Sequence, residues 1–240
     1  MSPIAIVQHE SSVPPGLVAD VLESESVDYF IVDAPREAAW PSIDDIDGLV
    51  VLGGTMNVDQ LDDYPFLARS RELMKAAIDH GRPTLGVCLG AQMMARALGA
   101  EVRRAGSRNA LFSSLELTEE GNNDALISEF PEIPVLQFHE DTFDVPQGAV
   151  LLAVSRVSGL PMAFRWGTRA YAVQFHFEVD SAIVGRWIEN VGTQTMVEEW
   201  GCLDGGRSLQ DAEQFVGQAS AGERLVKHFL QLVGSGATSL

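Results

Sequence analysis

Short apolar runs alternate with longer amphipathic segments along the first hundred or so residues of the chain. The pattern predicts strands at 3–7, 27–32 and 47–52 and helices at 16–22 and 65–80. Gly81 and Pro83 follow the second helix, and this combination of residues ends helices. A further strand at 83–86 leads into a helical run at 91–99. Strands and helices that alternate at these lengths predict a parallel sheet with helices on both faces.

The second half of the chain is less regular. Residues 103–165 contain shorter β segments at 111–117, 135–138 and 150–154, which we interpret as extra strands of the same domain. Residues 169–180 form an apolar strand that finishes in a His-Phe-Glu sequence. We therefore predict one doubly wound α/β domain over 1–240, with a mostly parallel sheet. Its core covers about residues 1–190, a loop rich in Gly and polar residues covers 191–208, and a C-terminal helix covers 209–233.

The most informative motif is PTLGVCLGAQ at residues 83–92. Cys88 falls at the predicted strand-to-helix turn, with Gly86 two residues before it and Gly90 two residues after it. This is the nucleophile-elbow arrangement with sulfur in place of the serine hydroxyl. The crowded turn requires residues without side chains beside the nucleophile, and the helix N-terminus favours thiolate over thiol. The alternative is an unreactive cysteine buried between strand and helix.

His176 and Glu178 can complete a catalytic site. Residues two apart on an extended segment point to the same side, so the two side chains can lie near each other. A thiol nucleophile needs a base to take its proton, and the base needs an anion to orient it. We predict that Cys88, His176 and Glu178 are nucleophile, base and orienting group. For His176 and Glu178 taken alone, the alternative is a core histidine beside an exposed glutamate. The nucleophile elbow at Cys88 argues against that alternative.

Four segments carry a family resemblance: GGTMNV at 53–58, GVCLGAQ at 86–92, QFHEDTFD at 137–144 and QFHFE at 174–178. Together they resemble the class I glutamine amidotransferases with a Cys–His–Glu triad. The chain is similar in particular to free-standing members that look like the amidotransferase part of GMP synthase. The resemblance covers about residues 1–190 and implies a flavodoxin-like fold. It also implies hydrolysis of glutamine, or of a related γ-glutamyl amide, through a thioester on Cys88.

The resemblance assigns further roles to residues around the triad. The backbone N–H groups of Gly54 and Leu89 would form the oxyanion hole, although a plain tight turn remains the alternative for the glycine pair. Substrate contacts would come from Gly53, Gln92, His139, Glu140 and Asp141. A metal centre at residues 139–141 is not expected, because adjacent residues on a strand point in alternating directions. The resemblance implies no cofactor and no metal.

Composition limits the remaining classes of function. The net charge of −18 argues against nucleic-acid binding, which needs clustered Lys and Arg. The 46% of hydrophobic residues include no run of the ~20 that a membrane span needs, and the N-terminus shows no signal peptide. Two cysteines give no disulfide framework, and a reducing compartment suits a reactive thiol. We therefore expect a cytoplasmic protein with a small-molecule γ-glutamyl substrate.

Three departures from the family pattern bear on the substrate. Phe177 replaces a proline between His176 and Glu178, and Thr55 stands where many relatives carry proline. Residues 108–113, RNALFS, replace a Glu-Ile-Gly-Trp stretch that borders the substrate in relatives. We therefore expect Phe177 and Phe112 to border the pocket, and a larger γ-glutamyl amide of an alkyl or aryl amine stands beside glutamine as a candidate substrate.

The chain offers no acceptor site for ammonia. The protein would either hydrolyse its amide or deliver ammonia to a separate synthetase, and both alternatives stay open. A regulatory scaffold that has the fold but no activity is a third alternative. The sequence does not determine the oligomeric state.

Overall fold

A mixed sheet of eight strands forms the centre of the computed structural model, which describes residues 2–130 and 132–235. Residues 1, 131 and 236–240 of the predicted single domain lie outside this description. The strand order is β2 (Tyr29–Asp33), β1 (Ile4–Gln8), β3 (Gly48–Val51), β4 (Thr84–Val87), β10 (Ala170–Val173), β9 (Pro161–Trp166), β8 (Val150–Ser155) and β6 (Leu115–Leu117). The first five are parallel, and each later strand is antiparallel to its neighbour. This confirms the predicted α/β fold with a mostly parallel sheet.

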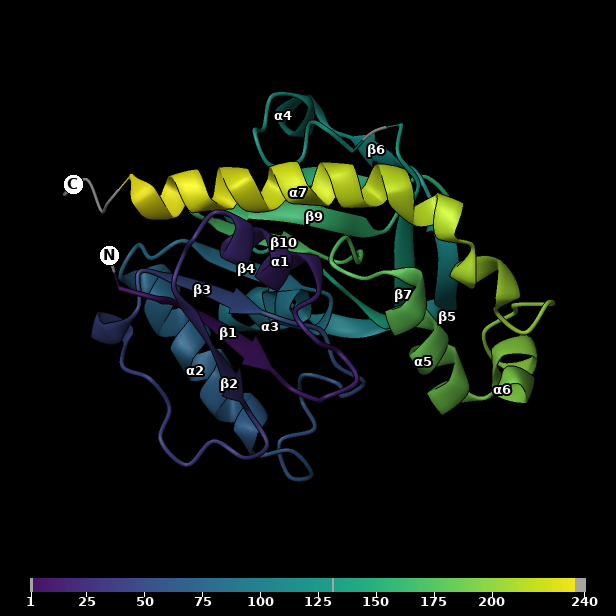
Figure 1. The fold of residues 1–240 in the computed structure, drawn as a ribbon, viewed down its shortest axis with the longest axis horizontal. Coiled ribbons are helices and arrows are strands. Elements are labelled where there is room, and N and C mark those ends of the chain that lie inside the picture. Colours follow the sequence, from purple (N-terminus) through teal and green to yellow (C-terminus); the bar gives the residue numbers. More distant parts are fainter. Residues whose placement is uncertain (1, 131, 236–240) are drawn as a thin grey trace.

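Helices cover both faces of the sheet (Figure 1). Ile4 and Ile6 of β1 belong to a core with α1 (Leu17–Ser24) and α7 (Ala212–Gly234). Ala5 and Val7 of the same strand belong to a second core with α2 (Phe66–Asp79) and α3 (Leu89–Ala97). Because both sides of the strand are buried, it reads in sequence as an unbroken apolar run.

A second, two-stranded sheet stands beyond the carboxyl ends of the parallel strands. It pairs β5 (Val102–Ser113) with β7 (Val135–Phe143) in antiparallel register. Figure 1 shows this sheet together with α5 (Ser181–Val191) and α6 (Thr193–Glu198) at the end of the molecule toward which β1 points. In open parallel sheets, sites form at this end of the strands.

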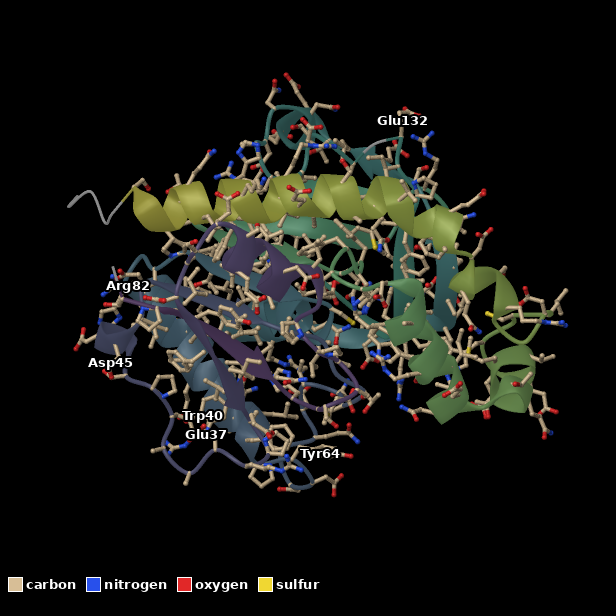
Figure 2. All side chains as sticks on the ribbon, viewed as in Figure 1. Glu37, Trp40, Asp45, Tyr64, Arg82 and Glu132 are labelled. Atoms are coloured by element: carbon tan, nitrogen blue, oxygen red, sulfur yellow. The ribbon has the colours of Figure 1, made fainter. Side chains whose placement is uncertain are left out.

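Charged side chains lie at the opposite end of the sheet, where the strands begin. Figure 2 labels Asp45 of η1 (Ile43–Asp45) and Arg82 there. The Arg82 guanidinium lies 3.1 Å from the Asp47 carboxylate. Among the described residues, no helix combines the length and the apolar character needed to cross a membrane.

Two predictions for the middle of the chain are corrected by the structure. The strand predicted at 111–117 is two strands in different sheets, since β5 ends at Ser113 and β6 begins at Leu115. β9 was not predicted, and neither was the polar first half of β5. The register of β5 shifts between Arg104 and Asn109, so this half has no regular alternation for a pattern to detect. The short helix α4 (Glu119–Asn122) follows β6.

Two further predictions, nearer the C-terminus, are also corrected. β10 ends at Val173, and His176 forms only an isolated bridge with Leu136, so the His-Phe-Glu sequence follows the strand instead of finishing it. The predicted loop at 191–208 contains α6 and the start of the 3₁₀ helix η2 (Arg207–Gln210), and the last helix begins at Ala212. Met196 is the buried residue of α6, and one buried apolar position is too little to produce a helical period.

Candidate active site

Cys88 occupies a sharp turn between β4 and α3. Its φ of 52° lies in a region that non-glycine residues rarely adopt, and its N–H donates to the Val173 carbonyl at 2.8 Å. A Cβ on Gly86 would lie 2.5 Å from the Gly90 carbonyl oxygen, and one on Gly90 would lie 2.0 Å from the Val51 carbonyl oxygen. Both glycines are therefore required by backbone contact, as the elbow motif predicts.

His176 and Glu178 are brought together beside this turn. Nδ1 of His176 lies 2.7 Å from Oε1 of Glu178, and both residues are buried. The segment is fixed by its backbone, because the N–H of His176 donates to Leu136 and the carbonyl of Glu178 accepts from Leu17. Gly16 permits the second contact, since its φ is 47° and a Cβ there would lie 2.1 Å from the Glu178 carbonyl oxygen.

The imidazole of His176 also meets Cys88. A Cβ built on Gly53 would lie 3.3 Å from Cε1 of His176 and 3.5 Å from Cβ of Cys88, so the two side chains converge on this glycine. Burial lowers the pKa of His176, but the negative charges of Glu178 and Cys88 and the hydrogen bonds to both outweigh it. Together they raise the pKa of His176 to about 10. The raised pKa favours the charged form of this imidazole.

Gly53 and Gly54 directly follow Leu52, beyond the end of β3. Within the described residues, the N–H groups of Gly54 and Leu89 donate no hydrogen bond. Leu89 is the first residue of α3, where N–H groups lack a partner in the helix. A Cβ on Gly54 would lie 2.8 Å from the Leu89 side chain, so the two residues are neighbours, and Gly54 lines both cavities beside Cys88.

Two residues that the sequence analysis did not include hold this glycine loop. His9 is fully buried, and its Nδ1 donates to the Gly53 carbonyl at 3.3 Å while its Nε2 accepts from Ser70 at 3.0 Å. Burial lowers the pKa of His9 to about 4, so this imidazole is neutral. Glu10 accepts the N–H of Thr55 at 2.9 Å and its hydroxyl at 3.1 Å. Their position at the carboxyl end of a parallel strand is the signal that could have found them.

Gln92 faces the site, as predicted, but its amide is occupied within the protein. Its Nε2 donates to the Asp141 carbonyl at 3.1 Å and to Oε1 of Gln174 at 3.2 Å. Nε2 of Gln174 in turn approaches Sγ of Cys88 at 3.7 Å. Gln92 therefore connects α3 to β7 by a hydrogen bond, and Gln174 is a further neighbour of the Cys88 thiol.

The three residues predicted at 139–141 lie on β7 and differ in their surroundings. His139 is buried with Nδ1 2.9 Å from the Asp141 carbonyl, and burial, aided by the charge of His176, lowers the pKa of His139 to about 4. Asp141 accepts from Nδ2 of Asn57 at 2.7 Å. Glu140 pairs with Arg104 and with Arg108, whose Nε lies 3.0 Å from Oε1. Within the described part of the chain, no three His, Cys, Asp or Glu side chains are grouped to hold a metal.

Two cavities formed by described residues meet at Cys88. They share the lining residues Gly54, Thr55, Cys88, Phe138 and Val191. The larger, of about 470 Å³, is lined by charged groups, and we call it the charged cavity; these are Arg104, Arg108, Glu140, Asp141 and Glu199. The smaller, of about 190 Å³, is lined by His176, Val13 and Trp187, and we call it the apolar cavity.

The aromatic wall of the site is not the predicted one. Phe177 is fully buried and turned toward α7, where a Cβ on Gly222 would lie 2.9 Å from its ring. Phe112 packs edge-on against Phe215. Neither ring lines either cavity, so the expectation that they border the pocket is wrong. The rings that do line the cavities are Phe138, Trp187 and Trp200, and Trp187 stands edge-on to the His176 ring at 4.9 Å.

Known proteins of one family resemble this chain over most of its length. The family model "Glutamine amidotransferase class-I" matches residues 7–190. The glutamine-hydrolysing GMP synthase subunit of Thermoplasma acidophilum is 30% identical over 167 residues, which cover 69% of this chain and 79% of the relative. The putative glutamine amidotransferase-like protein YfeJ of Salmonella typhimurium is 31% identical and covers 59% of this chain and 61% of its own length.

Solved structures show the same fold over almost the whole chain. A glutamine amidotransferase from Methylobacillus flagellatus superimposes with a TM-score of 0.85 at 22% identity, over 97% of this chain and 95% of its own. One from Thermotoga maritima superimposes with a TM-score of 0.76 at 26% identity, over 98% and 96% of the two chains.

Proposed function

The chain belongs to the class I glutamine amidotransferase family, and from that premise we propose that it hydrolyses γ-glutamyl amide bonds through a thioester on Cys88. One observation carries the proposal. Cys88 sits at a strained turn beside an imidazole that is hydrogen-bonded to a buried carboxylate. Nucleophile, base and orienting group in this relation are the requirements for acyl transfer to a thiol.

The reaction begins when Sγ of Cys88 attacks the γ-carbonyl carbon of the substrate. A C–S bond forms, and the oxyanion of the tetrahedral intermediate accepts from the free N–H groups of Gly54 and Leu89. Nδ1 of His176 is bound to Glu178, so Nε2 gives its proton to the amide nitrogen. The C–N bond then breaks, and ammonia or an amine departs.

Water completes the turnover. His176 takes a proton from a water molecule as the water oxygen attacks the thioester carbon. The C–S bond breaks, glutamate leaves, and the thiolate of Cys88 faces the imidazolium again. The atoms balance as one amide and one water giving glutamate and one amine or ammonia.

The glutamyl half of the substrate fits the charged cavity. Its α-carboxylate and α-ammonium groups need opposite charges, and this cavity offers Arg104 and Arg108 beside Glu140 and Glu199. Gln92, His139 and Asp141 shape the same end of the cleft through backbone and buried contacts, and Gly53 lies beside Cys88 and His176. They contact or position the glutamyl half.

A second candidate is a glutaminase that delivers ammonia to a separate synthetase. It is favoured by the names of two relatives from Thermoplasma species, each of which is a glutamine-hydrolysing subunit of GMP synthase. Glutamine alone would then be a poor substrate until the partner is present.

Glutamate release from glutamine and from a panel of γ-glutamyl amines tests the proposal. The purified chain should release glutamate from at least one of them, and Cys88→Ala should lower the rate by about 10⁴-fold or more. Release that is unchanged in Cys88→Ala would defeat the mechanism. If no substrate is cleaved, with or without a synthetase, the scaffold alternative holds.

Thiol alkylation gives an independent check. Burial raises the pKa of Cys202, whereas Cys88 faces a cationic imidazole. Cys88 should therefore react with iodoacetamide much faster than Cys202. Equal and slow labelling of the two would favour the scaffold.

A further inference from the structure

The two cavities differ in their access to His176. Both are lined by Cys88 and Gly54, but only the apolar cavity is lined by His176. The proton donor must lie within hydrogen-bond reach of the nitrogen that departs. The departing nitrogen of a bound γ-glutamyl amide therefore faces the apolar cavity, with the glutamyl chain on the opposite side of Sγ.

The apolar cavity is far larger than ammonia requires. Its volume is about 190 Å³, whereas a molecule the size of water occupies about 30 Å³ of liquid. An apolar cavity of about 150 Å³ can hold benzene. There is thus room beside the departing nitrogen for a group the size of a phenyl ring.

The lining of this cavity suits an apolar group. Val13, Phe138, Trp187 and Val191 supply apolar side chains beside the His176 edge. Its one acidic residue, Glu10, has both carboxylate oxygens occupied by Thr55. Among the lining residues of this cavity there is no Arg or Lys to recognise an anionic group.

We propose that the substrate is a γ-glutamyl amide of an arylalkylamine or similarly sized apolar amine, whose apolar group binds in the apolar cavity. This inference rests on the proposed γ-glutamyl amide hydrolysis. The C–N bond breaks, Nε2 of His176 supplies the proton, and the neutral amine leaves through the apolar cavity while the glutamyl group stays on Sγ. Water then releases glutamate.

A substrate series tests the size of the departing amine. The substrates are glutamine, γ-glutamyl methylamide and γ-glutamyl benzylamide, and the readout is kcat/KM for glutamate release. We expect the benzylamide to exceed glutamine by about 10- to 100-fold, the range that follows from burying one ring. The methylamide should stay close to glutamine, because a methyl group leaves most of the cavity unfilled.

A pair of neighbouring substitutions tests the location. Asn190 is exposed and lines only the apolar cavity, whereas Glu189 is exposed on the same helix and lines neither cavity. Asn190→Trp should lower the ratio of benzylamide to glutamine kcat/KM by about tenfold, and Glu189→Trp should leave that ratio at the wild-type value. Thr195→Trp narrows the charged cavity and should affect both substrates alike. Circular dichroism melting establishes that each variant is folded.

The outcomes separate the two proposals. Two results would overturn the assignment of the apolar cavity but leave γ-glutamyl hydrolysis standing. One is that glutamine is cleaved as well as the benzylamide. The other is that a folded Asn190→Trp keeps the wild-type ratio of benzylamide to glutamine kcat/KM. Either result would favour a segment of a partner synthetase as the occupant of the apolar cavity. If none of the three amides releases glutamate, hydrolysis itself fails and the inference fails with it.

Discussion

The two walls of the cleft around Cys88 are built in different ways. The inner wall consists of turns that follow parallel strands, and its residues are Gly53, Gly54, Cys88, Leu89, His176 and Glu178. Backbone hydrogen bonds and contacts with glycine hold it in place. The outer wall consists of β5, β7, α5 and α6, and side-chain ion pairs hold much of it. Arg108 with Glu199 is an example, with 30% and 53% of the two side chains exposed.

The difference indicates where this chain tolerates substitution. Half-exposed ion pairs contribute little to stability, about 0–1 kcal/mol each, so the outer wall can exchange them at low cost. At the glycines that hold the inner wall, an added Cβ would lie only 2.0–2.5 Å from a backbone oxygen. These glycines therefore cannot be replaced at low cost. We infer that the inner wall carries the chemistry and that the outer wall selects the substrate.

The strongest contrast is between two helical glycines. A Cβ on Gly90 would lie 2.0 Å from the Val51 carbonyl oxygen, whereas one on Gly185 of α5 meets only the flexible end of Gln210 at 3.3 Å. Gly90→Ala should lower the free energy of unfolding by about 3 kcal/mol or more. Gly185→Ala should stay within about 1 kcal/mol of wild type, since alanine favours helix. Urea unfolding measures both, and comparable losses in the two variants would remove the distinction between the walls.

Glu10 supports the inner wall through Thr55, so a substitution there can weaken the chemistry without changing the triad. Glu10→Ala frees Thr55, so the N–H of Gly54 loses its fixed direction toward the oxyanion. Complete loss of such a donor costs about 10²–10³ in rate, and we expect displacement to lower kcat by about 10- to 100-fold with little change in KM. Glu10→Gln keeps an oxygen for the Thr55 N–H and should recover part of the loss. A rise in KM at unchanged kcat would place Glu10 in substrate binding instead.

The inner wall was largely predictable from sequence because its signals are local. Gly86, Cys88 and Gly90 lie within five residues, and the turn they specify is recognisable without knowledge of the rest of the fold. The pairing of His176 with Glu178 also depends on residues two apart, and their approach at 2.7 Å survives even though the strand ends earlier than predicted. The catalytic roles of these residues stay predictions.

The outer wall was not predictable because its contacts are distant in sequence. Arg108 pairs with Glu199, 91 residues away, and no local pattern marks either partner. The same holds for His9 and Glu10, which hold a loop 44 and 45 residues farther along the chain. Phe177 was misplaced because the chain turns after β10 and directs the ring into the core under α7.

Arg108 tests the role assigned to the outer wall. Arg108→Ala removes a cation from the charged cavity, whereas Arg103→Ala removes one on the same strand that pairs with Asp144 outside both cavities. If Arg108 binds the α-carboxylate of the substrate, KM should rise by about tenfold while kcat stays within a few-fold. Arg103→Ala should leave both constants near wild type. Equal effects of the two substitutions on KM would show that only the general charge matters.

The smallest expected effect concerns two buried histidines, one on each wall. The pKa of His176 is raised to about 10 and that of His139 is lowered to about 4. NMR titration of the imidazoles should therefore show His176 charged and His139 neutral throughout pH 6–8. In Cys88→Ala the pKa of His176 should fall, because the negative charge and hydrogen bond of Cys88 contribute to raising it.

The same two values contribute to how stability depends on pH, and the buried His9, whose pKa is also lowered to about 4, adds to the acid side. Protonation of His176 favours the folded state, so its contribution is complete below pH 6.5 and is lost as the pH rises through about 10. His139 acts in the opposite sense: the unfolded chain takes up its proton first, so stability falls as the pH drops from 6.5 toward 4. Urea unfolding across this range should show both slopes. His139→Gln should reduce the acid slope in part, because His9 titrates in the same sense, and should leave the alkaline slope unchanged. If His176 instead titrates near 6.5, the inner wall does not hold the charge that its chemistry needs.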